Sequence, residues 1–338
     1  MLILYSLLLL AALAIILVGA ELFTNSLEHL GERFGLSEGL VGSVFAAVAT
    51  ALPETVVPII AVFFGGHDPT TGEHIGVGAI LGSPLMLVTL ALALVALFTG
   101  RQRGWNQPLK PEFSGMVRDL GYFTVAYSIA LMSLFIPRSG GVPVAVGLSL
   151  VFLYGYYVFN TVQASARLVS HGHGTQADRS LHLKRIGLSH NFWLELLQLL
   201  GGLGLIIAGA KLFVTGVETI AALTGLSALV LSLVVVPIAT EMPEKFNSIL
   251  WVRRGKDTLA FGNLTGAMVF QSTLLPAFGL QLNSWAPSRD VLWTMAITLG
   301  MAVWTLFLTL RRRLTPASLL LNGAAYLLFL LVILLPGR

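Results

Sequence analysis

The sequence is dominated by long stretches of apolar residues that carry almost no charge. There are ten of these stretches, and most are as long as the roughly 17–25 residues that cross a bilayer as an α-helix. They cover residues 1–20, 39–66, 75–98, 120–136, 141–159, 191–223, 226–252, 259–280, 291–310 and 314–335. In lipid a chain must satisfy its own backbone hydrogen bonds. The pattern therefore predicts an all-α polytopic membrane protein with ten transmembrane helices.

The composition excludes several other classes of protein. Only 11% of the residues are charged, whereas soluble chains carry about a quarter, so an ordinary soluble enzyme is excluded. The chain has no cysteine, which excludes disulfides and thiolate metal sites. The net charge is +4, but the cations lie at the ends of the apolar stretches, so we expect a lipid bilayer and no nucleic acid as partner. No Lys or Arg precedes the first stretch, which we interpret as a retained helix rather than a cleaved signal peptide.

The basic residues are distributed unevenly between the two sides of a ten-helix layout. Arg138, Arg289 and Arg338 lie on one side, while Lys211 and Lys245 fall inside apolar stretches. All the others lie on the opposite side: Arg33, Arg101, Arg103, Lys110, Arg118, Arg167, Arg179, Lys184, Arg185, Arg253, Arg254, Lys256, Arg311, Arg312 and Arg313. The positive-inside rule makes this basic side cytoplasmic. We therefore expect a multi-pass protein of the cell (inner) membrane, with both termini outside and a cytoplasmic linker at 160–190.

The two halves of the chain resemble each other. A shift of 190 positions gives thirteen identities, without a gap, in the window from Gly19 to Glu54. A shift of 184 positions then matches the glycines of 78–82 with those of 262–266. Each half has five apolar stretches, an odd number, so two copies must enter the membrane in opposite directions. This predicts two inverted five-helix repeats, 1–159 and 191–338, which is a design of secondary transporters with ion sites near the midplane.

A polar motif whose burial in the membrane costs free energy occupies equivalent positions in the two repeats. Residues 49–54 read Ala-Thr-Ala-Leu-Pro-Glu, and residues 239–244 read Ala-Thr-Glu-Met-Pro-Glu. An acid at membrane depth costs about 2.5–3.5 kcal/mol, so Glu54 and Glu244 are functional candidates. Each proline lacks an N–H and frees a carbonyl four residues earlier, on Ala49 and on Ala239.

Hydroxyl groups add to the carboxylate and carbonyl oxygens of the motif, so that every candidate ligand atom in it is an oxygen. Thr50 lies four residues before Glu54, and Thr240 four residues before Glu244, so each pair shares one helix face. Carboxylate, hydroxyl and carbonyl oxygens suit Ca²⁺, which takes six to eight oxygen ligands. The same set of oxygens can also bind Na⁺ or a proton.

These segments resemble the repeats of the sodium/calcium exchanger (calcium/cation antiporter) superfamily. The family's G-A, G-[IL]-S, G-T-S-x-P-E and G-N-x-x-G-S-N motifs correspond here to residues 19–20, 35–37, 50–54 and 78–84, and to residues 209–210, 225–227, 240–244 and 262–268. The resemblance implies that Glu54 and Glu244 are the central cation ligands, supported by Thr50 and Thr240.

The sequence also departs from the family motifs. The motif serine is replaced by Ala51 and by Glu241, and the Asn of G-N is present only as Asn263. Asn263 is therefore the best remaining neutral ligand; weaker candidates are Ser83, Thr265 and Gln271. Glu241 is either a third carboxylate ligand or the partner of Lys245 in an i,i+4 salt bridge, which we favour.

The sequence thus predicts a secondary antiporter that exchanges Ca²⁺ for Na⁺ by alternating access. A proton-coupled divalent cation exchanger is the first alternative, because clustered carboxylates can carry protons. A cation channel or a non-transporting membrane scaffold is the alternative of a different class. Glycine-rich phosphate loops and catalytic Ser/His/Asp sets are not evident, so we expect no enzyme. We expect metal cations and lipid as the partners, with no bound cofactor and no indicated protein partner.

Overall fold

The computed structural model describes residues 2–34, 51–64, 69–169, 180–186, 191–225, 227–253 and 255–334. Within these residues every regular element is a helix. In chain order they are α1 (Leu2–Arg33), α4 (Leu52–Phe64), α5 (Pro69–Met86), η2 (Leu87–Ala91), α6 (Leu92–Arg103), α7 (Phe113–Ser133), α8 (Val142–Val169), η3 (His182–Ile186), α9 (Phe192–Thr224), α10 (Ala228–Thr240), α11 (Met242–Arg253), α12 (Asp257–Gly279), α13 (Arg289–Leu310) and α14 (Pro316–Leu334). The prediction of an all-α protein is confirmed.

Six of the described helical segments are long and apolar enough to cross a membrane. They lie within α1, the continuous helical rod Pro69–Arg103, α8, α9, α13 and α14. Residues 52–64 and 228–238 form shorter apolar helices. The predicted stretch 226–252 is divided between α10 and α11, and α7 begins at Phe113, seven residues before the apolar stretch starts.

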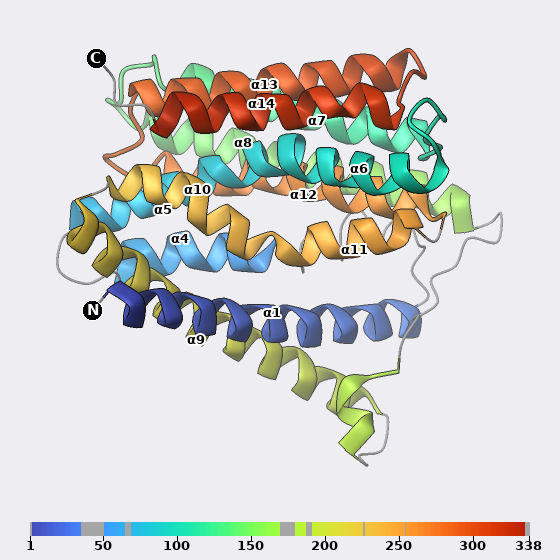
Figure 1. Cartoon of the computed structure of the whole chain (residues 1–338), viewed down its shortest axis with the longest axis horizontal. Coiled ribbons are helices and arrows are strands. Elements are labelled where there is room, and N and C mark those ends of the chain that lie inside the picture. Colours follow the sequence, from blue (N-terminus) through green and yellow to red (C-terminus); the bar gives the residue numbers. More distant parts are fainter. Residues whose placement is uncertain are drawn as a thin grey trace.

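The connections between helices gather at two opposite ends of the bundle. At the basic end, where α1 ends, Arg103 Nη1 lies 2.8 Å from Asp257 Oδ1, and Arg33 Nη2 lies 2.6 Å from Glu195 Oε1. At the other end, Arg138 donates to three carbonyl groups, those of Leu280, Leu282 and Trp285. The start of α1 and the end of α14 both lie at this second end (Figure 1).

Helices α1 and α9 pack along their length in opposite directions (Figure 1). Glycines make the approach close, since a Cβ on Gly19 would lie 2.8 Å from the carbonyl oxygen of Gly202. A Cβ on Gly209 would similarly lie 3.1 Å from the carbonyl oxygen of Ala12. Gly19 and Gly209 are equivalent positions of the two repeats at the offset of 190 residues, and so are Ala12 and Gly202. The repeated positions therefore make the same contact from both sides, as in a two-fold arrangement.

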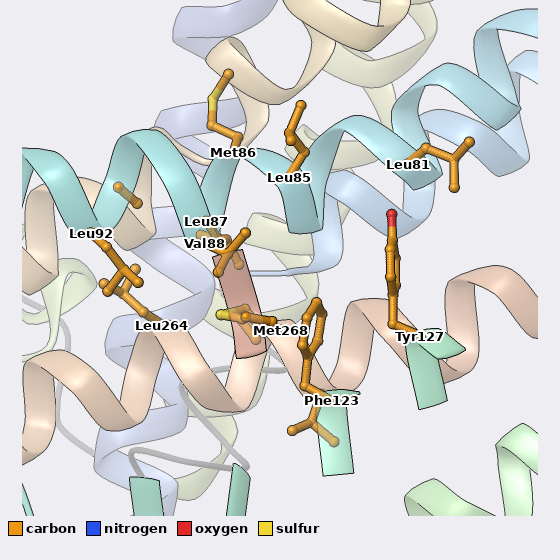
Figure 2. Close-up of a cluster of buried hydrophobic side chains, with 14 of the residues drawn as sticks. Leu81, Leu85, Met86, Leu87, Val88, Leu92, Phe123, Tyr127, Leu264 and Met268 are labelled. Carbon is orange, nitrogen blue, oxygen red and sulfur yellow. The ribbon is translucent and has the colours of Figure 1, made fainter. Parts of the chain in front are cut away.

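The largest apolar core lies away from α1 and α9, around the rod Pro69–Arg103. Figure 2 shows Val88 and Leu92 of this rod next to Leu264 and Met268 of α12, with Phe123 of α7 beside them. The rod contains a single π-helical segment, η2. Packed helices hold this irregular backbone at membrane depth, where exposure to lipid would be costly.

Candidate functional site

Two glutamates lie at the starts of two short helices, at the middle depth of the bundle. Glu54 lies in the first turn of α4, and Glu244 lies in the first turn of α11. Both helices begin near the middle of the molecule and run toward opposite ends (Figure 1). Both side chains are fully buried. The free N–H groups and the positive dipole end of a first turn stabilise negative charge, so each helix start favours its own carboxylate.

The helix that carries the second glutamate is interrupted just before it. Helix α10 ends at Thr240 and α11 begins two residues later, with Glu241 at the break (φ −87°, ψ 11°). Pro243 has no N–H, so the carbonyl of Ala239 lacks its usual partner four residues on. The predicted proline-broken turn is confirmed in this repeat. The break leaves carbonyl groups at the depth of the carboxylates.

The surroundings of Glu54 include residues from the other repeat. Its carboxylate interacts electrostatically with those of Glu244 and Glu241, and it adjoins the hydroxyl of Thr240. Neither oxygen of Glu54 accepts a hydrogen bond of normal geometry from the described residues. The Thr240 hydroxyl donates to the carbonyl of Val236 (3.1 Å), which leaves its lone pairs available. The structure therefore brings together four predicted site residues from two separate segments.

Two of the predicted ligands, Ala49 and Thr50, lie outside the described residues, and their role stays a prediction. Among the residues that the structure does describe, no three Asp, Glu or His side chains converge closely enough to hold a metal ion by themselves. Neutral oxygens are therefore needed to complete the coordination of any ion bound beside Glu54 and Glu244.

Neutral polar side chains line the same region from the neighbouring helices. Asn263 of α12 is fully buried and donates to the hydroxyl of Ser248 (3.4 Å), while its own carbonyl oxygen accepts no hydrogen bond from the described residues. Ser83 and Gln271, also fully buried, adjoin the carboxylate of Glu241. These three side chains can supply oxygen ligands without adding charge.

Thr265 was among the weaker candidate ligands, and the structure places it elsewhere. Its hydroxyl donates to Asp119 Oδ2 of α7 (2.8 Å). Asp119 also accepts a hydrogen bond from Tyr157 (3.1 Å) and lies 3.5 Å from Nε of Arg118. Sequence reasoning missed this buried carboxylate, because the apolar stretch was drawn from Leu120. An acid directly beside the start of an apolar stretch was the available signal.

The structure contains the salt bridge that we favoured for Glu241. Lys245 Nζ lies 3.7 Å from Glu241 Oε2, and both side chains are buried. The ammonium group also lies 3.3 Å from the carbonyl oxygen of Pro237 and 2.8 Å from Sδ of Met86. In Figure 2, Met86 points away from the apolar core around Met268. The role of Glu241 as a third ligand stays a prediction beside this pair.

The sequence and the fold of the chain were compared with those of known proteins. The putative antiporter CaxA of Alkalimonas amylolytica is 24% identical over 340 residues, covering 95% of this chain and 97% of that protein. The crystal structure of the H⁺/Ca²⁺ exchanger CAX superposes with a TM-score of 0.75 at 18% identity, covering 98% of this chain and 82% of that one. A structure of the sodium-calcium exchanger NCX_Mj has a TM-score of 0.63 at 20% identity and covers both chains completely. These two likenesses show the fold.

The model of the family described as "Sodium/calcium exchanger protein" matches residues 4–163 and 194–335, which is most of the chain. The helical fold and the buried glutamates at two helix starts agree with this match. The chain therefore belongs to the sodium/calcium exchanger family of membrane antiporters.

Proposed function

We propose that this antiporter exchanges Ca²⁺ for Na⁺ by alternating access, with Glu54 and Glu244 as the central ligands. The observation that carries the proposal is the placement of these two buried acids at the starts of two short helices, in equivalent positions of the repeated sequence. Their carboxylates interact across the two halves. Buried carboxylates favour a bound cation, because an uncompensated negative charge is costly in a low-dielectric interior.

The chemistry of the neighbouring groups supports a hard cation as substrate. Ca²⁺ prefers six to eight oxygen ligands, and the groups around the two glutamates are mainly oxygen donors. In the proposal the remaining ligands are the hydroxyls of Thr50 and Thr240, the carbonyls of Ala49 and Ala239, the carboxylate of Glu241 and the amide oxygen of Asn263. Na⁺ would occupy some of the same oxygens, so the two ions compete.

The proposal includes two inverted five-helix repeats, 1–159 and 191–338, joined by a linker at 160–190. The antiparallel pairing of α1 with α9 supports it, together with the equivalent contacts of Gly19 and Gly209. In this arrangement the basic end is cytoplasmic and both termini lie outside. Rocking of one part of each repeat against the rest would expose the glutamates to alternate sides.

A crevice lies beside α4, between this helix, α5 and α12. It is lined by Thr55 and Pro58 of α4, Ile80 of α5, and Phe270 and Phe278 of α12. Thr55 directly follows Glu54, so the crevice begins within one turn of the proposed ligand. We propose this crevice as the path by which ions enter from outside.

Coupling to protons is the second candidate. The departures from the family motifs favour it, since Ala51, Ala79, Pro84 and Met268 stand where those motifs have Ser or Asn, and their side chains have no oxygen to offer a bound Na⁺. A carboxylate needs no further ligand in order to carry a proton. The coordination of the counter-ion therefore separates the two candidates, while the Ca²⁺ ligands are the same in both.

The test is Ca²⁺ uptake into liposomes that contain the purified protein, driven either by an outward Na⁺ gradient or by a pH gradient. We expect the Na⁺ gradient to drive saturable uptake, and Glu54→Gln and Glu244→Gln to abolish it. The exposed Glu32→Gln is the matched control and should retain full uptake. Normal uptake by both site variants would refute the site, uptake driven only by pH would favour the second candidate, and uptake without any counter-gradient would indicate a channel.

A further inference from the structure

Lys245 is a cation built into the proposed ion site. Among the described residues it is the only lysine or arginine that is buried, with 4% of its surface exposed. Its Nζ lies 3.7 Å from Glu241 Oε2 and interacts electrostatically with Glu244 and Glu54 as well. One ammonium group therefore interacts electrostatically with all three carboxylates of the region.

A structural role alone explains this ammonium group poorly. Removing two charges from water costs several kcal/mol per ion, so replacing a buried ion pair by apolar residues is often neutral or stabilising. The pair of Glu241 and Lys245 also has loose geometry, since the closest contact between the charged groups is 3.7 Å. The contact of Nζ with Sδ of Met86 offers the charge little compensation.

The charges of the region determine how many positive charges an occupied site takes up. Glu54, Glu241 and Glu244 contribute three negative charges, and Lys245 contributes one positive charge, which leaves a net charge of −2. An occupied site crosses the low-dielectric interior at least cost when its total charge is zero. One Ca²⁺ satisfies this condition, and so do two monovalent cations.

We propose that Lys245 replaces one transported monovalent cation and thereby fixes the exchange at one Ca²⁺ for two monovalent ions, which makes transport electroneutral. This inference rests on the proposed function, because it assumes exchange at Glu54 and Glu244. It holds for Na⁺ and for H⁺ as the counter-ion. Without the ammonium group the three carboxylates would require a third monovalent cation, and each cycle would move one net charge.

The experiment measures the balance point of exchange in liposomes as a function of membrane potential, which is set with K⁺ and valinomycin. For the wild type, the Ca²⁺ concentration ratio across the membrane at which net flux stops should equal the square of the counter-ion concentration ratio at every potential. For Lys245→Met, the Ca²⁺ concentration ratio should instead depend on the cube of the counter-ion concentration ratio. A potential of about 100 mV should then move the balance point of this variant roughly 50-fold, because one net charge crosses the membrane.

Two further variants separate charge from structure. Lys245→Arg keeps the positive charge and should remain electroneutral. The double variant Glu241→Gln with Lys245→Met removes both charges of the pair, restores a net charge of −2 and should also become electroneutral again. A structural role would not predict that the second substitution cancels the voltage response of the first.

Each outcome decides the proposal. A balance point of the wild type that moves with potential overturns it, and so does a Lys245→Met variant that stays electroneutral. If Lys245→Met does not fold, the wild type and the double variant still test the proposal, since a balance point of either protein that moves with potential overturns it. Absence of any counter-gradient-driven Ca²⁺ flux in the wild type is a different result, because it refutes the proposed function itself.

Discussion

Asp119 is a buried carboxylate whose hydrogen bonds join three helices outside the proposed ion site. It accepts from Tyr157 of α8 and from Thr265 of α12 while lying on α7 itself. Asp119→Ala would leave both hydroxyls without this acceptor, and we expect the free energy of unfolding to fall by about 2–3 kcal/mol. Asp119→Asn should cost less, because the amide oxygen still accepts a hydrogen bond. Thermal unfolding of the purified protein in detergent measures both changes.

The control for Asp119 is the exposed Glu32→Ala, which should leave the unfolding temperature unchanged. An Asp119→Ala variant as stable as the wild type would show that these hydrogen bonds contribute no net stability. A variant that is stable but inactive would instead assign Asp119 to ion transport.

Single residues could be predicted from sequence where their neighbours along the chain reveal their role. Glu54 and Glu244 lie in recognisable motifs, and Lys245 lies one turn after Glu241, so the salt bridge follows from helical spacing. The contact of Asp119 with Thr265 and that of Met86 with Lys245 could not be predicted in this way. Each joins segments more than a hundred residues apart, and the packing of helices, which periodicity does not encode, decides which faces meet.

The pairing of α1 with α9 depends on glycines at the contact, and α9 contains its own control. A Cβ on Gly202 would lie 2.7 Å from the carbonyl oxygen of Gly19, whereas a Cβ on Gly204 has nothing within 4 Å. Both positions lie inside the same helix, where alanine is favoured over glycine by about 1 kcal/mol. We therefore expect Gly202→Ala to lower the unfolding temperature and Gly204→Ala to raise it or leave it unchanged. Equal effects of the two substitutions would show that close backbone approach does not stabilise the pair.

The start of α7 depends on a side-chain cap at the basic end. Glu112 accepts hydrogen bonds from the backbone N–H groups of Ser114 (3.0 Å) and Gly115 (2.5 Å). Partial burial alone would raise the pKa of Glu112, but these hydrogen bonds, with that from the Ser114 hydroxyl, outweigh it and hold the pKa below its ordinary value of 4.5. The ionised cap therefore stabilises the folded protein above the ordinary pKa, and this stabilisation is lost as the pH falls through the lowered pKa.

Replacing this cap gives a pH-dependent prediction. Glu112→Ala should cost about 1 kcal/mol of stability at neutral pH, which is the usual loss for an N-cap residue. The difference from the wild type should shrink as the pH falls below 4.5, since the wild-type cap becomes protonated there. Unfolding temperatures of both proteins, measured across this range, provide the test. If the difference in unfolding temperature stays constant down to the lowest pH measured, the charge of Glu112 does not contribute to stability.

At the level of elements, hydropathy located the helices better than it located their ends. The apolar stretch that begins at residue 120 missed the first two turns of α7, because Glu112 caps a helix whose start is polar. Arg138 was an exception to the distribution of basic residues. The structure explains it, since its guanidinium group donates to three carbonyls at the end of α12 and in the turns that follow. Such tertiary caps depend on chain segments that meet only after folding.

The whole molecule was predictable to the extent that the repeat constrains it. A gapless match at an offset of 190 predicts equivalent contacts, and Gly19 and Gly209 make them. The interruption between α10 and α11 also follows from the repeated proline motif. It did not follow from the sequence that, among the described residues, no three acidic side chains converge closely enough to hold a metal ion by themselves. How closely side chains converge depends on the relative tilt of helices, and neither spacing nor composition specifies that tilt.

The proposed orientation of the whole molecule can be tested with single cysteines, because the native chain has none. Gln107 and Arg311 are exposed at the basic end, whereas Ser139 and Asn283 are exposed at the opposite end. If the basic end is cytoplasmic, a membrane-impermeant maleimide added to intact cells should label Ser139→Cys and Asn283→Cys. It should label Gln107→Cys and Arg311→Cys only after the membrane is permeabilised.

This labelling pattern also tests the inverted repeat, because the four positions come from both halves of the chain. Gln107 lies in the first half and Arg311 in the second, yet both must share one side if the halves cross the membrane in opposite directions through five helices each. The fold packs these positions toward one end, where the backbone N–H of Leu109 donates to the carbonyl of Leu314 (2.9 Å). Labelling of Gln107→Cys and Arg311→Cys from outside, with protection of the other two, would reverse the orientation and keep the repeat. Labelling of one member of each pair would refute the inverted repeat itself.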